Sequence, residues 1–273
     1  MKRSLITAAA LTVIAVSLAG CAAGGAGTDA ISATGTPTDD SLAAVHESGT
    51  LTVGTEGTYR PFTYHEGGSG KLTGYDVEVI EAVADKLGVE VEFEETQWDA
   101  IFQGLKAGRF DVVANQVSIT PERVDEYEFS TPYTFSTGVV VVKKGDSSIT
   151  SFEDLSGKST AQSLSSNWYA LAEESGAKIQ AVEGWAQSVA LVEQGRVDAT
   201  VNDSLTFLDY KKQTGASGLK VAATTEEQSE NAFAFAKGDT ALARAVDTAL
   251  AELTTSGELA KISNKYFGVD VSK

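Results

Sequence analysis

The sequence has a single cysteine, Cys21, and only two histidines, His46 and His65. One cysteine excludes a disulfide within the chain. Cys thiolates and His imidazoles are common metal ligands, and the chain has too few of them for a metal site built from these side chains. We therefore expect a protein without a bound metal.

Positive charge is scarce as well. The chain carries 21 Lys and Arg against 38 Asp and Glu, a formal net charge of -17. An acidic surface repels the phosphates of nucleic acids and anionic lipid headgroups. Nucleic acid is therefore excluded as a partner.

Sequence motifs of common enzymes are missing. There is neither a G-x-S-x-G elbow nor an HExxH helix. The run Gly67-Gly68-Ser69-Gly70-Lys71 resembles a phosphate-binding loop, but His65 and Leu72 stand where that motif needs Gly and Ser or Thr. We expect no cofactor, and we interpret the glycine run as a hairpin-like turn.

No long hydrophobic run is present either. Residues 5–18 are mostly apolar but too short to predict a membrane span with confidence, and Lys2 and Arg3 precede them. This pattern is typical of a secretory signal, here residues 1–20. The segment Leu18-Ala19-Gly20-Cys21 resembles the bacterial lipobox, which predicts lipidation of Cys21. The alternative is an ordinary signal with an unrelated cysteine.

Small and polar residues dominate positions 21–40, which predicts a flexible tether. The remaining residues alternate strand and helix patterns. Examples are a strand at Leu51–Val53, a helix at Tyr75–Leu87 and a long helical region at Ala241–Phe267. This alternation predicts an α/β fold, and the length allows two lobes.

One segment is repeated. Trp98–Asn115 aligns without gaps on Trp185–Asn202, with Trp, Gly, Arg, Asp and Asn in common. Each copy predicts a helix, a glycine stop and a strand. Chance similarity is the alternative to two similar lobes. Ligands of open α/β sheets bind beyond the carboxyl ends of strands, so the repeat predicts that Gln116 and Asp203 face each other across a cleft.

A zwitterion fits this cleft. Thr120 and Pro121 predict the start of a helix, and Arg123 in its first turn can hold a carboxylate with two hydrogen bonds. Asp203 can hold an ammonium group, so that each buried charge has a partner. The alternatives are a capped helix with a solvated Arg123 and an Asp203 that caps the helix after it.

Other side chains can complete a pocket. Tyr59 lies on a predicted loop, Trp98 opens a predicted helix, and either could instead cover a lobe core. The segment Gln162-Ser163-Leu164-Ser165-Ser166-Asn167 precedes a predicted helix at Trp168–Glu174 and offers hydroxyl, amide and free N–H groups, among them the hydroxyls of Ser165 and Ser166.

The order and spacing of several segments resemble the amino-acid-binding proteins of bacterial ABC importers, solute-binding protein family 3, of the histidine-, glutamine- and cystine-binding type. The resemblance covers nearly everything from Leu51 to Phe267. The segments include Val53-Gly54-Thr55-Glu56-Gly57-Thr58-Tyr59-Arg60-Pro61-Phe62, Leu72-Thr73-Gly74-Tyr75-Asp76-Val77, Ser118-Ile119-Thr120-Pro121-Glu122-Arg123, Phe129-Ser130-Thr131-Pro132-Tyr133 and Asn202-Asp203.

This resemblance implies a two-lobed periplasmic-binding-protein fold, in which each lobe is a mostly parallel sheet flanked by helices and two crossover strands join the lobes. Lobe 1 is expected at 41–136 and 230–273, and lobe 2 at 137–229. The resemblance also implies these ligand-binding residues: Glu56, Tyr59, Trp98, Gln116, Ser118, Thr120, Arg123, Ser165, Ser166 and Asp203.

The implied function is that of a receptor, not an enzyme. It would be a monomer outside the cytoplasm, anchored to the cell membrane as a lipoprotein, that delivers a polar amino acid to an ABC permease. Leu164-Ser165-Ser166 departs from the usual family residues and, with Asn115-Gln116-Val117-Ser118, is similar to the cystine-binding branch. Glutamine is the next candidate. Two alternatives stay open: a dehydratase-like enzyme on the same fold, with Glu56 as general acid, and a ligand-sensing module for a receptor.

Overall fold

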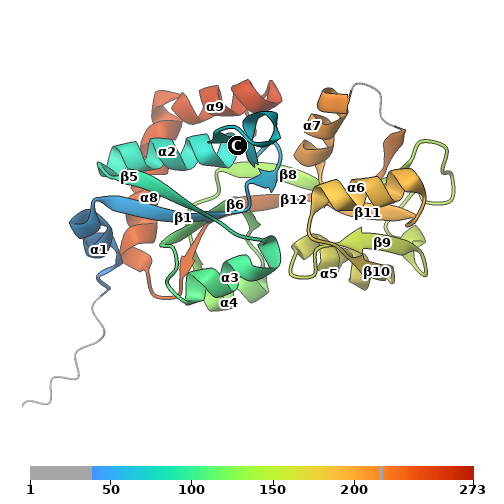
Figure 1. The fold of residues 1–273 in the computed structure, drawn as a ribbon, viewed down its shortest axis with the longest axis horizontal. Helices are drawn as coiled ribbons and strands as arrows, with labels where there is room; N and C mark the ends of the chain where they lie inside the picture. The colour runs from blue at the N-terminus through green and yellow to red at the C-terminus, as the bar shows by residue number, and fades with distance from the viewer. Residues whose placement is uncertain (1–38, 215–217) are drawn as a thin grey trace, which may run out of the picture. The chain divides into compact units, whose positions relative to one another are not determined.

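The computed structural model describes residues 39–214 and 218–273. In this part of the chain, a nine-stranded mixed sheet runs through the molecule in the order β10-β9-β11-β8-β12-β6-β1-β5, with β7 paired to β12 (Figure 1). Its strands are β1 (Thr50–Thr55), β5 (Glu90–Glu95), β6 (Val112–Ser118), β7 (Tyr127–Phe129), β8 (Thr134–Lys143), β9 (Ser159–Gln162), β10 (Lys178–Ala181), β11 (Ala199–Asp203) and β12 (Leu219–Ala236).

Helices and short elements complete the fold. The helices are α1 (Ser41–Ser48), α2 (Tyr75–Leu87), α3 (Trp98–Lys106), α4 (Pro121–Glu126), α5 (Asn167–Glu174), α6 (Trp185–Gln194), α7 (Ser204–Thr214), α8 (Thr240–Ser256) and α9 (Glu258–Phe267). The short elements are the 3-10 turns η1 (Glu66–Gly68) and η2 (Glu153–Leu155) and the strands β2 (Thr58–Tyr59), β3 (Thr63–His65) and β4 (Leu72–Thr73).

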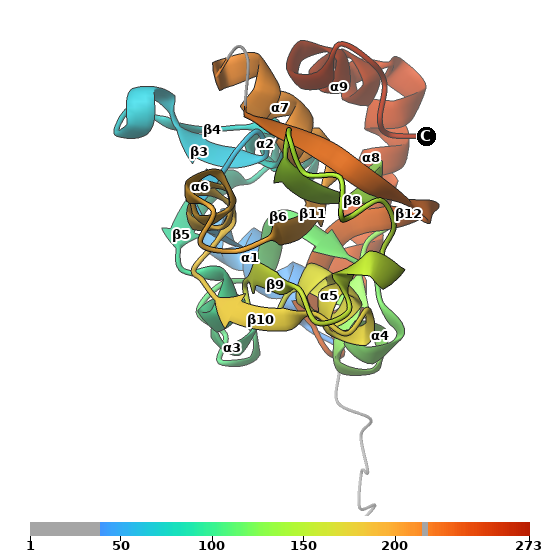
Figure 2. The same cartoon turned by 90° about the vertical axis from the view of Figure 1, so that its right-hand side faces the viewer.

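The elements form two lobes, which confirms the predicted fold class. In lobe 1, β1 runs parallel to β5 and β6, and helices α1 to α4, α8 and α9 surround them. In lobe 2, β9 runs parallel to β10 and β11, and helices α5 to α7 surround them (Figures 1 and 2). The long strands β8 and β12 pair with each other and pass from one lobe to the other. They are the crossover strands that the family resemblance implies.

Most predicted elements are where the sequence placed them. The predicted helix at Tyr75–Leu87 is α2, and it buries Val79, Ile80 and Val83. Helix α4 starts at Pro121 after a Thr120 cap, as expected. The glycine run lies in a hairpin, because β3 and β4 are antiparallel neighbours around η1.

The internal repeat is visible in the contacts of both lobes. Asp111 Oδ2 accepts hydrogen bonds from the main-chain N and the hydroxyl of Thr52, at 2.8 and 2.5 Å. Its counterpart in the repeat, Asp198, accepts the same two bonds from Ser159, both at 2.7 Å. Each aspartate thus fastens the helix-turn-strand unit to the neighbouring strand. Two identical contacts at aligned positions make chance similarity a poor explanation.

A close approach explains two of the glycines. Phe110 is 2% exposed, and its ring packs between Gly54 of β1 and Gly104 of α3. A Cβ atom at Gly54 would lie 2.5 Å from this ring, and one at Gly104 would lie 2.7 Å from it. Neither position can carry a side chain without moving Phe110.

The predicted signal peptide, nearly all of the predicted tether and Cys21 lie outside the described residues. Within the described part of the chain, no helix is both long enough and apolar enough to cross a membrane.

Candidate functional site

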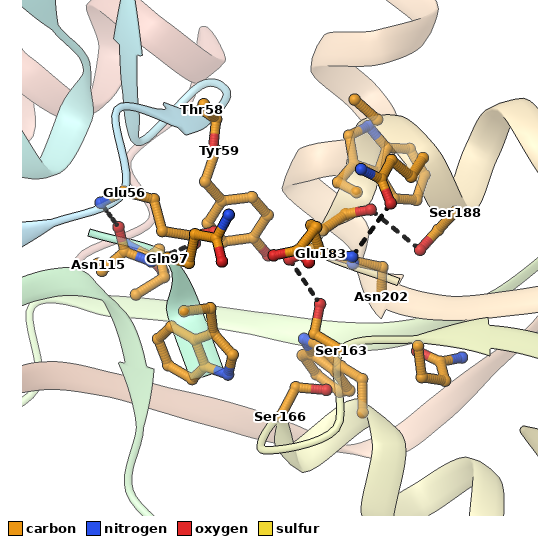
Figure 3. A pocket seen from close by; sticks show the side chains of 18 of the residues that line it. Glu56, Thr58, Tyr59, Gln97, Asn115, Ser163, Ser166, Glu183, Ser188 and Asn202 are labelled. Atoms are coloured by element: carbon orange, nitrogen blue, oxygen red, sulfur yellow. Dashed lines mark hydrogen bonds between the residues drawn. The ribbon is translucent and has the colours of Figure 1, made fainter. Parts of the chain in front are cut away.

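A cavity of about 490 Å³ lies between the lobes, and both lobes contribute to its walls. Figure 3 shows Glu56 and Asn115 on the side of lobe 1, facing Glu183 and Asn202 on the side of lobe 2. The lining residues are Glu56, Thr58, Tyr59, Glu95, Thr96, Gln97, Trp98, Asn115, Gln116, Gln162, Ser163, Ser166, Asn167, Trp168, Glu183, Gly184, Trp185, Ala186, Gln187, Ser188 and Asn202. Its size suits one small molecule.

The loop after β1, the strand β6 and the segment from the end of β5 to the start of α3 form the lobe 1 wall. Glu56 Oε2 accepts a hydrogen bond from Asn115 Nδ2 at 2.6 Å, and its main-chain N donates to Asn115 Oδ1 at 2.9 Å. Burial raises the pKa of Glu56 to about 7; the bond from Asn115 opposes this rise and the charge of Asp99 adds to it. A cationic group in the cavity would favour the ionised form of Glu56.

Gln116 has an unusual backbone, with φ at 50°. Between Val113 and Val117, β6 has three residues where the paired strand β12 has one, so the strand bulges here. Asp76 accepts from the main-chain N of Gln116 at 2.6 Å and from its Nε2 at 2.7 Å. These bonds stabilise a backbone conformation that residues other than glycine rarely adopt.

The same bonds orient the Gln116 amide. Its Nε2 also donates to Thr134 Oγ1 at 3.1 Å, whereas its Oε1 is buried without a hydrogen-bond partner. Gln116 lines the cavity, and Oε1 is the atom of its amide that is left without a partner. Burial raises the pKa of Asp76 to about 7, while the bonds from Gln116 oppose the rise.

The starts of two helices form much of the lobe 2 wall. Ser166 caps α5 by accepting from Tyr169 N at 3.0 Å, and Trp168 follows in the first turn. Gly184 precedes α6, and Trp185 is its first residue. Gln162, at the end of β9, is 2% exposed, and its Nε2 has no hydrogen-bond partner.

Direct contacts join the lobes around the cavity. Asp99 Oδ1 in lobe 1 accepts from the main-chain N of Ser165 at 3.0 Å and from its hydroxyl at 2.6 Å. The Tyr59 hydroxyl donates to Asn202 Oδ1 at 2.9 Å. An ion pair joins Arg60 Nε to Asp209 Oδ2 at 3.2 Å.

Arg123 lies beside the cavity and is not among the residues that line it. Its guanidinium carbon is 5.4 Å from the ring centre of Trp98, a lining residue, and 5.1 Å from that of Phe102. Two of its donors are used: Nη1 donates to the main-chain oxygen of Ser118 at 2.9 Å, and Nη2 donates to the main-chain oxygen of Ser165 at 3.1 Å. Burial lowers the pKa of Arg123 to about 10, so it remains a cation at neutral pH.

Asp203 is buried beneath the wall, at 2% exposure. Its Oδ1 accepts from Leu205 N at 2.8 Å, and its Oδ2 accepts from the Ser136 hydroxyl. The carboxylate therefore holds the start of α7, as in the capping alternative. Burial raises the pKa of Asp203 to about 6, and the bond from Ser136 opposes this.

Five predicted site residues line the cavity: Glu56, Tyr59, Trp98, Gln116 and Ser166. The others surround it. Ser118 donates from its hydroxyl to Asn231 Oδ1 at 2.8 Å, Thr120 caps α4, and Ser165 joins the lobes as described above. With Arg123 and Asp203, their roles in binding stay predictions.

Sequence reasoning omitted several lining residues. Trp185, Asn115 and Asn202 could have been found, because the repeat aligns Trp98 with Trp185 and Asn115 with Asn202. Glu183 and Ser188 carry no such signal. Among residues 39–214 and 218–273, no group of three or more His, Cys, Asp or Glu side chains could hold a metal ion.

Known proteins with a similar sequence are solute-binding proteins. Residues 51–269 match the bacterial extracellular solute-binding proteins, family 3. The L-cystine-binding protein TcyA of Bacillus subtilis is 50% identical over 273 residues, which cover 100% of both chains.

Two solved structures are also similar. The L-cystine solute receptor of Neisseria gonorrhoeae, in an unliganded open conformation, is 47% identical with a TM-score of 0.58, over 85% of this chain and 99% of that one. An ancestral arginine-binding protein bound to arginine is 38% identical with a TM-score of 0.76, over 81% of this chain and 99% of that one. Like TcyA, both are named for the amino acid they bind, and none of the three names describes an enzyme.

Proposed function

This chain belongs to the bacterial extracellular solute-binding proteins, family 3, and from that premise we propose that it is the amino-acid receptor of an ABC importer. It captures a polar amino acid between its lobes and delivers it to a membrane permease. The observation that carries this proposal is the cavity of about 490 Å³ with polar side chains from both lobes on its walls. A ligand that touches both lobes favours their closure, because it makes all of its contacts only in the closed state.

A hinge in β8 and β12 would allow this closure. The lobe boundaries expected from the sequence, after residues 136 and 229, fall at the pair Ser136 and Ser229, which face each other in register. Close by, the pairing shifts: two steps along β8, from Thr137 to Val139, match four steps along β12, from Thr224 to Gln228. Such a bulge interrupts the ladder and makes this level of the two strands the natural place for bending.

The arrangement of the lobes supports a closed form. The chain is more similar in sequence to the gonococcal receptor, yet it superimposes better on the arginine-bound ancestor, with TM-scores of 0.58 and 0.76. The first of these structures is open and unliganded, and the second contains its ligand. The hydrogen bonds of Ser165 in lobe 2 with Asp99 and Arg123 in lobe 1 also hold the lobes together, as a closed form requires.

Cystine is the amino acid that we propose. TcyA and the gonococcal receptor bind cystine by name, and both are close in sequence to this chain over most of its length. In the proposed complex Arg123 takes the carboxylate of one head group and Asp203 its ammonium. Tyr59 and Trp98 enclose the rest of the ligand, and Gln116 accepts a hydrogen bond from it.

A lipid anchor at Cys21 would keep the receptor at the outer face of the cell membrane, where a monomer can meet its permease. The lipobox-like segment Leu18-Ala19-Gly20-Cys21 supports the proposed lipid anchor. Fractionation of cells tests it: the wild-type protein should sediment with membranes, and Cys21→Ala should not yield a lipidated form. A wild-type protein without lipid by mass spectrometry would overturn it.

Calorimetric titration of the purified protein with the standard amino acids and cystine tests the receptor function. Tight one-to-one binding of cystine is the expected result, accompanied by a smaller radius of gyration in solution scattering. Tight binding of another amino acid alone would keep the receptor and exclude cystine. No binding of any amino acid would overturn the proposal.

A further inference from the structure

The start of α6 is directed to the cavity without a capping side chain. The residue before the helix is Gly184, which has no side chain to accept from the first N–H groups, and α6 then runs for 10 residues. Gly184, Trp185, Ala186 and Gln187 all line the cavity. The first N–H groups of a helix have no partner inside the helix and carry partial positive charge, so they attract an anion.

Gln162 provides a second, independent hydrogen-bond donor beside this helix start. Gln162 is 2% exposed and lines the same cavity, and its Nε2 has no hydrogen-bond partner. Its main-chain oxygen accepts from Val182 N at 3.1 Å, which fixes the end of β9 next to the segment that leads into α6. A buried donor without a partner is unfavourable, so a ligand acceptor that comes within reach of Nε2 would be bound favourably.

A carboxylate of the other lobe lies beside this site. A Cβ atom at Gly184 would be 3.8 Å from Glu56 Oε1, so the side chain of Glu56 reaches across the cavity to the start of α6. Donors for an anion and an acceptor for a cation are therefore neighbours. This pairing fits a carboxylate and an ammonium group attached to one carbon atom.

We propose that the cavity has a second head-group subsite, in which the start of α6 and Gln162 Nε2 hold a carboxylate and Glu56 holds the ammonium group beside it. The ligand class is then an amino acid with two zwitterionic ends, such as cystine. This inference rests on the proposed function, in which Arg123 and Asp203 take the first end. It adds the residues that distinguish a double-headed ligand from glutamine or another single-headed one.

Ligands that lack one group of the second head test the subsite without altering the protein. The disulfide of cysteine with cysteamine lacks only the distal carboxylate of cystine, and the disulfide of cysteine with 3-mercaptopropionic acid lacks only the distal ammonium group. Calorimetry should show each of them bound about tenfold or more weakly than cystine, because a charged hydrogen-bond partner is lost.

The variant Gln162→Glu replaces the donor by an acceptor of the same shape. We expect about tenfold weaker binding of cystine and no further loss for the cysteamine disulfide, which has no carboxylate at this place. Gln180→Glu, the same substitution at an exposed position of β10, is the matched control and should bind both ligands as the wild type does.

The outcomes separate this inference from the function on which it rests. Equal affinity of the wild type for cystine and the cysteamine disulfide would overturn the second subsite, whether or not the variant folds. Equal weakening of both ligands by Gln162→Glu would overturn the role of Gln162. Tighter binding of glutamine than of cystine would also overturn the subsite and leave the receptor function standing, whereas no binding of any amino acid would overturn both.

Discussion

Asp99 and Ser165 stand on opposite lobes, and one carboxylate oxygen of Asp99 accepts both the main-chain N–H and the hydroxyl of Ser165, at 3.0 and 2.6 Å. Neither residue lines the cavity. The pair therefore stabilises the contact between the lobes from outside the cavity walls.

Removal of this contact should weaken binding from outside the cavity. In Asp99→Ala we expect about tenfold lower affinity for the amino acid, since the apparent affinity scales with the fraction of protein that can close. Calorimetry measures the affinity and solution scattering the closure. The control is Asp125→Ala, at an exposed carboxylate of α4. Unchanged affinity in Asp99→Ala would show that the contact does not limit closure.

The affinity for a ligand ammonium should depend on pH through Glu56. Burial raises the pKa of this carboxyl to about 7, so below that pH most molecules hold a proton there. An adjacent ammonium favours the ionised form, and binding at low pH must release the proton. The affinity should therefore rise between about pH 5 and 7 and level off above.

The variant Glu56→Gln distinguishes a pH dependence that comes from Glu56 from one that comes from other buried carboxyls. The amide keeps an oxygen for the bond from Asn115 Nδ2 but does not titrate. The variant should bind more weakly at pH 8 and show a flatter pH profile than the wild type. A profile identical to that of the wild type would assign the pH dependence to other groups, such as Asp203.

The free energy of unfolding of the ligand-free protein should decrease as the pH rises from about 4 to about 7. Burial raises the folded-state pKa of Glu56 and Asp76 to about 7 and that of Asp203 to about 6. Over this range the folded protein holds protons that the unfolded chain has released, so the slope of stability against pH is negative. Urea unfolding at pH 5 and pH 7.5 measures it. A stability that is level or higher at pH 7.5 would contradict the prediction.

Local patterns in the sequence predicted the elements well. The helix at Tyr75–Leu87 follows from its apolar spacing, and the start of α4 follows from Thr120 and Pro121. The repeat indicated which strands end at the cleft, because it depends on contacts within one lobe, such as those of Asp111 and Asp198.

The contents of the cavity were harder to predict, because they depend on contacts between distant segments. The repeat aligns Gln116 with Asp203, and the two positions differ in the structure. Gln116 lies in a bulge and lines the cavity, whereas Asp203 turns to Leu205 and Ser136. The polar segment before α5 included Gln162, but its place in the cavity wall follows from the packing of β9 beside β10 and α6.

Asp76 should act on the ligand through Gln116. In Asp76→Asn the new amide oxygen can accept from Gln116 N, but its NH₂ group then meets Gln116 Nε2, a donor. The Gln116 amide would turn over, and its Nε2 would take the place of the unpartnered Oε1. Affinity for a ligand that donates to Gln116 should fall about tenfold. The variant Gln116→Ala should show a similar loss, and the double variant no greater loss than either alone, since both remove one acceptor. Additive losses in calorimetry would mean that Asp76 acts by another route.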